Sequence, residues 1–404
     1  MRYPTLPISS FCSTGSGGTP SRANVGDYYG GKILWVKSGE LREDVILDTE
    51  EKITELAIKE SSAKLVPKGA LLIAMYGATI GRIAELGVEG ATNQAVCHII
   101  PDENIADKRY LFFGLRFKVP ELIAKGAGGA QPNINQQIIR DTQLPLPPLP
   151  EQKLIAAILD KADSIRRKRQ EAVRLTEELL RSVFIDMFGD PVENCKKWPL
   201  MPIGAVIQAI ETGWSANSED RPREKGEWAV LKISSVTLGR FLPGEYKVVV
   251  DGQIDRELLT PKRGDLLFSR ANTRELVAAT CLVEQDEPKL FLPDKLWKII
   301  PDEKITCTEY LRYLLAHPRF REKLTKQATG TSGSMLNISQ AKVRGINMPV
   351  PPIKLQKQFS DCVWRSYNIR NKLEAASQST DTLFNSLMKL AFFADAIISL
   401  FTLR

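Results

Sequence analysis

The sequence has few of the residues, and none of the motifs, on which common enzyme active sites depend. It contains only two histidines, His98 in an apolar run typical of a strand and His317 before Pro318, and a structural role is the more frequent one for such residues. It has no GxxxxGK(S/T) loop to hold a nucleotide phosphate, no GxGxxG between an expected strand and helix, and no Asp/Asn-Pro-Pro-aromatic tetrapeptide of the amino-methyltransferase kind. The triplet Glu50–Lys52 matches half of a nuclease motif but is more typical of a solvated turn. We therefore expect a protein that is not itself an enzyme and binds no cofactor.

Cysteine pairs and long apolar runs are also missing. The six cysteines are scattered without a CxxC pair, which argues against a zinc or other metal site and predicts reduced thiols. Residues Met1–Ser10 contain no apolar h-region, and no apolar run reaches the roughly 18 residues of a membrane-spanning helix. We expect a cytoplasmic protein with no membrane partner.

Charge and length limit the remaining possibilities. The net charge of +7 and the pI near 9.0 make a polyanionic partner plausible, although an ordinary basic surface accounts for such values equally well. A chain of 404 residues is too long for a single core and predicts two or more domains.

The segment Leu144–Asp190 organises the chain. Four prolines between positions 145 and 150 delay the start of a helix to about Leu149, and Gly189 followed by Pro191 ends it. At 1.5 Å per residue, the intervening stretch of about 38 residues predicts a rod of roughly 57 Å. Apolar residues repeat at intervals of three and four, the pattern of a helix that packs on another helix. The predicted contact positions are Ile155, Ile158, Ala162, Ile165, Arg169, Ala172, Thr176, Leu179 and Val183.

A second Pro-Pro lead and a second long helix follow 204 positions later. Adding that offset to the first set gives Phe359, Cys362, Ser366, Ile369, Leu373, Ala376, Thr380, Leu383 and Leu387. Seven of these nine are apolar or cysteine, and the threonines Thr176 and Thr380 coincide. This is an internal repeat, and the second helix is the expected partner of the first, with Ile165 and Leu373 packed between them.

The segments before the two helices repeat as well. Ile99–Pro101 recurs as Ile299–Pro301, and Tyr110–Leu111 recurs as Tyr310–Leu311. Short apolar strands mixed with a few helices predict a mixed α/β fold with an irregular sheet. The expected domains are residues 1–148, a long helix over 149–190, residues 191–352, and a C-terminal helix and tail over 353–404.

Short motifs stand in a recognisable order along the repeat: Ser16–Ser21, Gly77–Gly81, Thr92–Ala95, Leu144–Gln152, Met187–Pro191, and Gly330–Ser334 with Asn337 and Ile338. With these motifs, the repeat resembles the specificity subunit of type I restriction–modification enzymes over nearly the whole chain. The tail Ala391–Arg404 departs from it, because it lacks the polar Arg-Gly-Glu type of ending.

The resemblance implies two target recognition domains, each reading one half of a split DNA site, separated by two long antiparallel coiled-coil helices. It further implies that these helices dock two methyltransferase subunits, with restriction/translocase subunits joining that core. A rod of about 57 Å corresponds to roughly 17 base pairs, which is long enough for two half-sites and a gap.

DNA-binding candidates are polar or cationic residues in loops that follow apolar strands, where Arg can pair with guanine, Asn with adenine and Lys with phosphate. In the first domain they are Ser16, Thr19, Arg22, Lys37, Thr79, Arg82, Asn93, Gln94, Gln131 and Asn133. In the second they are Lys232, Arg270, Asn272, Thr273, Arg274, Ser332 and Ser334. An ordinary turn or surface charge is the alternative for any single member.

Two other functional classes remain open. A combined restriction–methylation enzyme would need catalytic motifs that the sequence lacks. A coiled-coil scaffold or adaptor with two globular binding domains would account for the helices, but not for the repeated, loop-rich domains.

Overall fold

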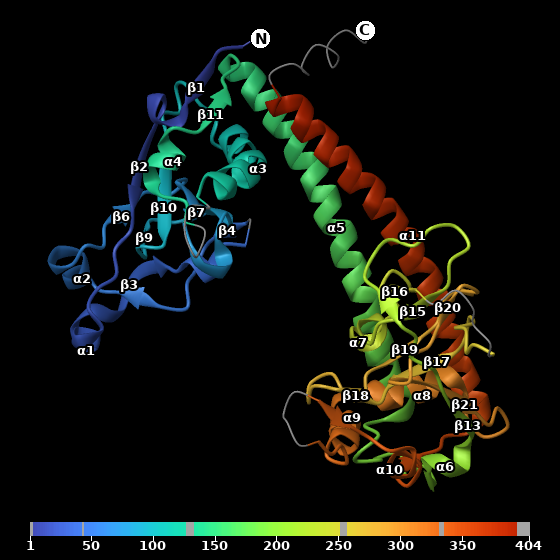
Figure 1. Ribbon diagram of the computed structural model, residues 1–404. Helices are drawn as coiled ribbons and strands as arrows, with labels where there is room; N and C mark the ends of the chain where they lie inside the picture. Colours follow the sequence, from blue (N-terminus) through green and yellow to red (C-terminus); the bar gives the residue numbers. More distant parts are fainter. Residues whose placement is uncertain (1–2, 43, 127–132, 251–256, 331–334, 394–404) are drawn as a thin grey trace. The chain divides into compact units, whose positions relative to one another are not determined.

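The computed structural model describes residues 3–42, 44–126, 133–250, 257–330 and 335–393. The chain divides into two units: unit 1 is Met1–Gln170 with Ala375–Arg404, and unit 2 is Glu171–Glu374. Each unit holds one globular α/β domain and one half of each of two long helices, α5 (Leu149–Phe188) and α11 (Ile353–Phe392) (Figure 1). The prediction of two long helices after Pro-rich leads is therefore confirmed. No helix in the described ranges is long and apolar enough to cross a membrane.

The domain of unit 1 contains a five-stranded sheet of order β2-β10-β7-β8-β4, a four-stranded sheet of order β5-β3-β9-β6, and the pair β1-β11. The strands are β1 (Thr5–Pro7), β2 (Cys12–Ser16), β3 (Tyr29–Val36), β4 (Val45–Ile46), β5 (Lys52–Ile53), β6 (Leu65–Val66), β7 (Leu71–Ala74), β8 (Ile83–Leu86), β9 (Gly90–Thr92), β10 (Val96–Pro101) and β11 (Gln143–Pro145). The helices before α5 are α1 (Val25–Tyr28), α2 (Glu55–Glu60), α3 (Lys108–Lys125) and α4 (Gln136–Arg140).

The domain of unit 2 repeats this plan with sheets of order β13-β21-β17-β19 and β14-β16-β15-β20, and with the pairs β12-β23 and β18-β22. Its strands are β12 (Leu200–Pro202), β13 (Ile207–Thr212), β14 (Ser218–Glu219), β15 (Ala229–Leu231), β16 (Tyr246–Val249), β17 (Leu266–Ser269), β18 (Ala271–Asn272), β19 (Thr280–Leu282), β20 (Leu290–Phe291), β21 (Leu296–Pro301), β22 (Leu336–Asn337) and β23 (Asn347–Pro349). Its short helices are α6 (Ile203–Val206), α7 (Ser234–Thr237), α8 (Thr308–Ala316), α9 (Pro318–Thr325) and α10 (Gln340–Arg344).

The first four strands of the two main sheets correspond in order. β10 and β21 carry the repeated Ile-Ile-Pro sequence, and each is the second strand of its sheet, between β2 and β7 or between β13 and β17. The phenol of Tyr110 donates to the carbonyl of Pro145 at 2.8 Å, and Tyr310 makes the same bond to Pro349 at 2.8 Å. The mixed α/β repeat expected from the sequence is confirmed.

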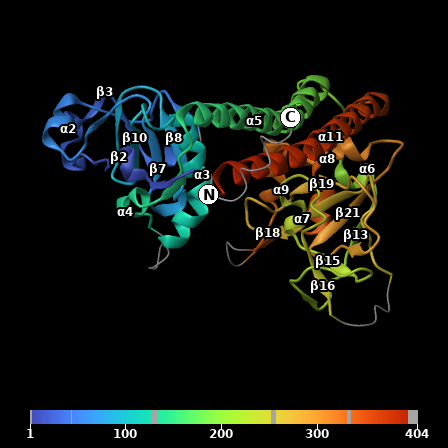
Figure 2. The ribbon, with the colours of Figure 1, turned by 90° about the horizontal axis from the view of Figure 1, so that it is seen from above.

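The main sheet of each unit is buried on both faces, because alternate residues of its strands point to opposite sides and join different hydrophobic clusters. In unit 1, Leu71 and Ile73 of β7 join a cluster with α3 and the helix pair, whereas Leu72 and Ala74 join a second cluster on the other face. α3 thus packs between the five-stranded sheet and the halves of α5 and α11 in its unit (Figure 1 and Figure 2). In unit 2, α8 takes the same place, with Phe184 of α5 and Phe359 of α11 5.6 Å apart between ring centres.

The predicted phase of the helix contact was wrong at several positions. Among the predicted contact residues, five large apolar side chains are substantially exposed: Ile158 (44%), Ile165 (40%), Leu179 (57%), Ile369 (55%) and Leu383 (57%). Cys362 is also exposed. Phe359 and Thr380 are buried as predicted, and Leu373 is half-buried.

The buried stripe of α5 is displaced by one residue, to Ala156, Leu159, Leu180 and Phe184. These residues follow the same intervals of three and four, and their side chains meet the globular domain as well as the other helix. The sequence therefore contained two apolar stripes one residue apart, and packing against the domain selects the second. Arg169 does lie at the contact, where its guanidinium donates to the carbonyl of Ala376 at 2.6 Å and to the hydroxyl of Thr380.

Two adjacent leucines test which stripe holds the helix pair. Leu180 is 2% exposed and Leu179 is 57% exposed. Leu180→Ala should lower the free energy of unfolding by about 2–5 kcal/mol, because it leaves a cavity among aromatic side chains. Leu179→Ala should change it by no more than about 0.5 kcal/mol. Denaturant unfolding of both variants measures the difference, and equal losses would contradict the assignment.

Candidate nucleic-acid interface

In unit 1, loops carrying most of the predicted residues leave one end of the five-stranded sheet. Because β2, β10, β7 and β8 are successively antiparallel, the end of β2 at Ser16, the start of β10 at Val96 and the loop joining β7 to β8 share that end. The amide of Gly17 donates to the carbonyl of Val96 at 3.1 Å, and that of Met75 donates to Ala95 at 2.8 Å. This arrangement brings Ser16, Thr79, Arg82, Asn93 and Gln94 to the same end of the sheet. A common DNA-binding surface, as predicted from the sequence, requires such an arrangement.

The second sheet adds Lys37 and Thr19 to this end. The amide of Asn93 donates to the carbonyl of Val36 at 2.9 Å, so Lys37 lies beside the Asn93–Gln94 turn. A Cβ at Gly17 would lie 2.1 Å from the carbonyl oxygen of Thr92, so only glycine allows the Ser16–Thr19 segment to approach the turn this closely.

Asn133 also joins the cluster, whereas Gln131 lies outside the described residues. Tyr76 forms an isolated antiparallel bridge with Asn133, and the amide of Ile134 donates to the carbonyl of Met75 at 2.7 Å. Asn133 itself is exposed.

The cations Arg22 and Lys37 are already paired. The Arg22 guanidinium lies 4.3 Å from the ring centre of Tyr29 and 2.7 Å from Glu51, while the Lys37 ammonium lies 2.9 Å from Glu50. Their hydrogen bonds to these carboxylates raise the pKa of both cations, and the same bonds lower the pKa of Glu50 and Glu51. Both glutamates of the triplet Glu50–Lys52, which was expected to be a solvated turn, therefore form ion pairs.

Unit 2 builds the same sheet end with different side chains. The amide of Arg270 donates to the carbonyl of Lys295 at 3.1 Å, and the carbonyl of Arg270 accepts from Ile338 at 2.9 Å. These bonds match those of Met75 to Ala95 and Ile134, so Arg270 occupies the place of Met75. Asn272 pairs with Leu336 in the short β18-β22 ladder. Ser332 and Ser334 lie outside the described residues.

The segment Arg270–Arg274 differs in exposure along its length. The Arg270 guanidinium lies 6.0 Å from the ring centre of Trp297, and its Nε is buried without a hydrogen-bond partner among the described residues. Asn272 and Thr273 are half-buried, and the Asn272 side chain accepts from the Thr273 amide at 2.8 Å. Arg274 is exposed, and within the described chain neither it nor Arg82 has an ion-pair partner.

The loops joining β7 to β8 and β17 to β19 share a backbone constraint. Gly81 and Ala278, each two residues before the second strand, have φ values of +79° and +61°. Their amides make equivalent bonds, to Ala74 and to Ser269, both at 2.9 Å. Alanine adopts this left-handed conformation at a cost of about 1–2 kcal/mol. The loop of unit 2 nevertheless keeps the same backbone shape, although alanine stands where unit 1 has glycine.

The sequence prediction missed Trp214, Ser215, Asp294 and Lys295. The amide of Trp214 donates to the carbonyl of Leu292 at 2.8 Å, as Gly18 does to Thr92, and the Trp214 ring stacks on Phe291 with centres 5.9 Å apart. Gly213 carried the signal, because its Cβ would lie 2.0 Å from the carbonyl of Leu292, as at Gly17. The repeat offset is 196 at Trp214 and 200 at Lys295, so the 204-residue offset of the long helices does not align these residues.

Lys232 has the same position in the domain of unit 2 as Lys37 has in the domain of unit 1. Val230 of β15 pairs with Phe291 of β20 in parallel, as Trp35 pairs with Ala91, so both lysines follow equivalent strands. The Lys232 ammonium lies 2.8 Å from a carboxylate oxygen of Asp220, and the hydrogen bond to Asp220 raises the pKa of the lysine.

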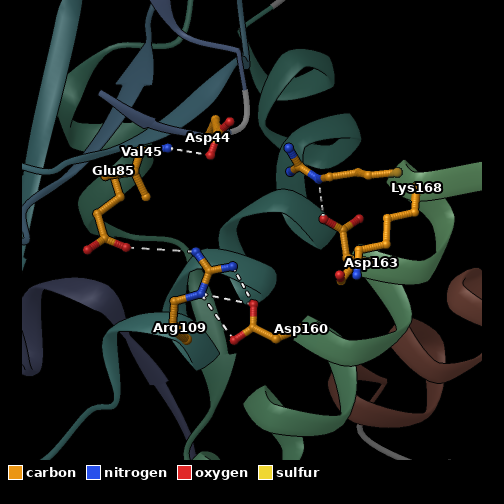
Figure 3. Close-up of a pocket in the computed structure, with 9 residues that line it drawn as sticks. Asp44, Val45, Glu85, Arg109, Asp160, Asp163 and Lys168 are labelled. Carbon is orange, nitrogen blue, oxygen red and sulfur yellow. Dashed lines mark hydrogen bonds and ion pairs between the residues drawn. The ribbon is translucent and has the colours of Figure 1, made fainter. Parts of the chain in front are cut away.

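A pocket of about 420 Å³ in unit 1 lies where the domain meets α5 (Figure 3). Three of the four carboxylates that line it are paired with cations. Glu85 lies 2.7 Å from Lys108, and Asp160 accepts from the Arg109 Nε at 3.0 Å. Asp163 is 4% exposed and contacts three arginines, Arg116 (3.0 Å), Arg166 (2.9 Å) and Arg167 (2.6 Å). This network joins the domain to the helix, and the described residues contain no His/Cys/Asp/Glu group suited to a metal ion.

Comparison with known proteins gives a consistent family. The family model described as "Type I restriction modification DNA specificity domain" matches residues 4–175 and again 195–379. The MjaIX specificity subunit of a type I restriction enzyme from Methanocaldococcus jannaschii is 24% identical over 373 residues, covering 87% of this chain and 84% of that protein. The EcoBI specificity subunit from Escherichia coli is 30% identical over 339 residues, covering 74% and 68%.

Solved structures share the fold. The S subunit of a type I restriction–modification system from M. genitalium gives a TM-score of 0.59 at 14% identity, covering 97% of this chain and 96% of that one. A chain from a study of type I R-M complex assembly and conformational transition gives 0.52 at 17% identity, covering 97% and 98%.

Asp163 predicts a pH-dependent contribution to stability. Burial alone would raise its pKa, but the Arg167 hydrogen bond and the charges of Arg116 and Arg166 outweigh it, and the pKa lies below its ordinary value. Asp163→Asn should therefore cost about 3 kcal/mol near neutral pH. Because the folded-state pKa is depressed, this difference should shrink as the pH falls below about 4 and Asp163 of the parent protonates.

The control is Asp160→Asn, whose side chain is 39% exposed and should cost no more than about 1 kcal/mol. Denaturant unfolding of parent and both variants across acid pH measures these differences. A pH-independent difference for Asp163→Asn would contradict the electrostatic origin.

Proposed function

The chain belongs to the type I restriction–modification DNA specificity family, and we propose that it is the sequence-specific DNA-binding subunit of such a complex. It recognises a bipartite, asymmetric double-stranded DNA site and docks two methyltransferase subunits, through which restriction/translocase subunits join. The chain itself is non-catalytic. Residues 1–148 and 191–352 form the target recognition domains, and 149–190 and 353–404 hold the helices that separate them.

The duplicated sheet end is the observation that carries this proposal. Both domains present a lysine after an equivalent strand, Lys37 and Lys232, and both carry an exposed arginine in the loop joining equivalent strands, Arg82 and Arg274. Cations of this kind bind phosphates, and the neighbouring Asn, Gln and Thr side chains can bond base edges. Two such surfaces on one chain fit a site with two halves.

Divergence between the two surfaces fits an asymmetric site. Met75 and Arg270 occupy the same backbone position, and so do Gln94 and Asp294, yet their hydrogen-bonding capacities differ. Side chains that offer different donors and acceptors select different bases. Each domain should therefore read its own half-site sequence.

Exposed apolar residues on the helices support docking of two copies of one partner. Ile165 and Ile369 are equivalent in the repeat, as are Leu179 and Leu383, and all four are at least 40% exposed. Unit 1 contains Ile165 and Leu383, and unit 2 contains Ile369 and Leu179. Each unit thus exposes one member of each pair, which is the arrangement expected if each docks one methyltransferase subunit.

Arg274 and Arg82 give a reciprocal test of recognition. If Arg274 bonds the O6 and N7 of a guanine, Arg274→Ala should cost about 1–3 kcal/mol and relax one position of the second half-site only. Arg82→Ala should by the same argument affect only the first half-site. If either arginine contacts phosphate alone, binding should weaken uniformly and the salt slope should fall by about one unit.

The measurement is binding of the full chain, assembled with its methyltransferase subunits, to duplexes varied in each half-site at two salt concentrations. Arg270→Ala serves as the comparison within the same loop, because the Arg270 guanidinium packs over the Trp297 ring whereas Arg274 is exposed. Loss of recognition at both halves from one substitution would contradict separate reading surfaces.

Docking is tested by stoichiometry. Ile165→Asp combined with Leu383→Asp places charge on the exposed apolar residues of unit 1 and leaves those of unit 2 intact. The complex should then retain one methyltransferase subunit instead of two, as measured by native mass spectrometry. Ser164→Asp, which adds one carboxylate at an exposed polar neighbour, should leave both subunits bound. Two bound subunits in the double variant would contradict this docking surface.

A further inference from the structure

The equivalent lysines of the two domains are both held by a carboxylate. Lys37 lies 2.9 Å from Glu50, and Lys232 lies 2.8 Å from Asp220. The lysine side chains are only 30% and 28% exposed, whereas the Glu50 and Asp220 side chains are 73% and 66% exposed. Each lysine is therefore positioned by its domain, and its partner carboxylate faces solvent.

Further contacts hold each carboxylate segment in place. In unit 1, the Glu40 carboxylate accepts from the amide of Lys37 at 2.7 Å and from the amide of Glu50 at 2.9 Å, and so ties the two partners' backbones together. In unit 2, Arg221 follows Asp220 and forms two hydrogen bonds with Glu227, at 2.7 and 2.9 Å. The two pairs are thus built by different contacts.

The carboxylates come from segments that are not equivalent in the repeat. Glu50 lies just before β5, the strand that pairs with β3, whereas Asp220 follows β14, which pairs with β16. The lysine is repeated, but its partner arrives from a different part of each domain. A lysine–carboxylate pair thus forms in both domains from segments that differ, which points to a role for the pair itself.

We propose that Glu50 and Asp220 pair with these lysines in the DNA-free protein and that phosphates of the DNA backbone displace them on binding. The two carboxylates thereby lower the sequence-independent affinity for DNA. This inference rests on the proposed function, in which both lysines contact DNA. A displaced carboxylate stays near the phosphate that replaced it and repels it. That repulsion does not depend on base sequence, because phosphate contacts carry none.

Glu50→Gln tests the proposal in unit 1 and Asp220→Asn tests it in unit 2. Each should tighten binding to a duplex of unrelated sequence about threefold, as expected for removing a unit charge some 7 Å from a phosphate in water. The slope of log affinity against log salt should steepen by up to about one unit for each substitution. Binding is measured with the full chain assembled with its methyltransferase subunits.

Asp48→Asn is the matched control for Glu50→Gln, because Asp48 is equally exposed (73%), carries the same charge and pairs with Lys52 instead. The gain in affinity should exceed that of the control. It should vanish when Glu50→Gln is combined with Lys37→Met, because without Lys37 no phosphate is held beside residue 50. Equal gains from the two acid substitutions, or a gain that survives Lys37→Met, would overturn the proposal, as would unchanged or weaker binding by Glu50→Gln.

Failure of the proposed function is recognised separately. It would appear as a parent complex that binds unrelated and bipartite target duplexes equally well, whatever the acid substitutions do. The inference is judged on the unrelated duplex alone.

Discussion

A buried glutamine at the start of each long helix fixes how the helix leaves its domain. The amide nitrogen of Gln152 donates to the carbonyls of Pro147 (2.8 Å) and Ile105 (2.9 Å), and its oxygen accepts from the amide of Asp107 (2.8 Å). Gln356 makes the equivalent bonds to Pro351, Ile305 and Cys307 in unit 2. Both side chains are fully buried, so each lost bond would leave an unsatisfied polar group. This side chain fixes the point at which the helix leaves its domain, and the ion pairs of Asp160 and Asp163 and the packing of α3 add to the orientation in unit 1.

The parts of the fold that the sequence predicted are those set by local chemistry or by repetition. Prolines mark the start of α5 and α11 because they cannot occupy a helix interior, and the repeated Ile-Ile-Pro strand and its tyrosine partner mark the core of each domain. The predicted phase of the helix contact failed because exposed Ile158 and Leu179 have the same spacing as buried Leu159 and Leu180. Only packing against α3 and α8, which is tertiary, distinguishes the two stripes.

The sequence placed the candidate residues on loops that the structure brings to one sheet end, whereas their role in binding DNA stays a prediction. Residues as far apart as Ser16, Lys37, Arg82 and Asn133 were chosen as polar positions after apolar strands, and the antiparallel order of the strands brings those loops to one sheet end. Their ion pairs could not be predicted, because Glu50 reaches Lys37 only through the pairing of separate segments. Trp214 was missed for a related reason, since short insertions between the repeats shift its alignment with Gly18.

Under the proposed function, duplication with divergence reconciles two opposing demands on one chain. Docking two copies of the same partner requires equivalent surfaces, and the helices keep exposed isoleucine and leucine at matching positions, such as Ile165 and Ile369. Reading two different half-sites requires surfaces that differ, and the domains place Met75 and Arg270 on the same backbone position. The backbone hydrogen bonds around that position involve main-chain atoms only, so the side chain can change while the loop keeps its shape. Left-handed Gly81 and Ala278 show the same tolerance at the other end of the loop.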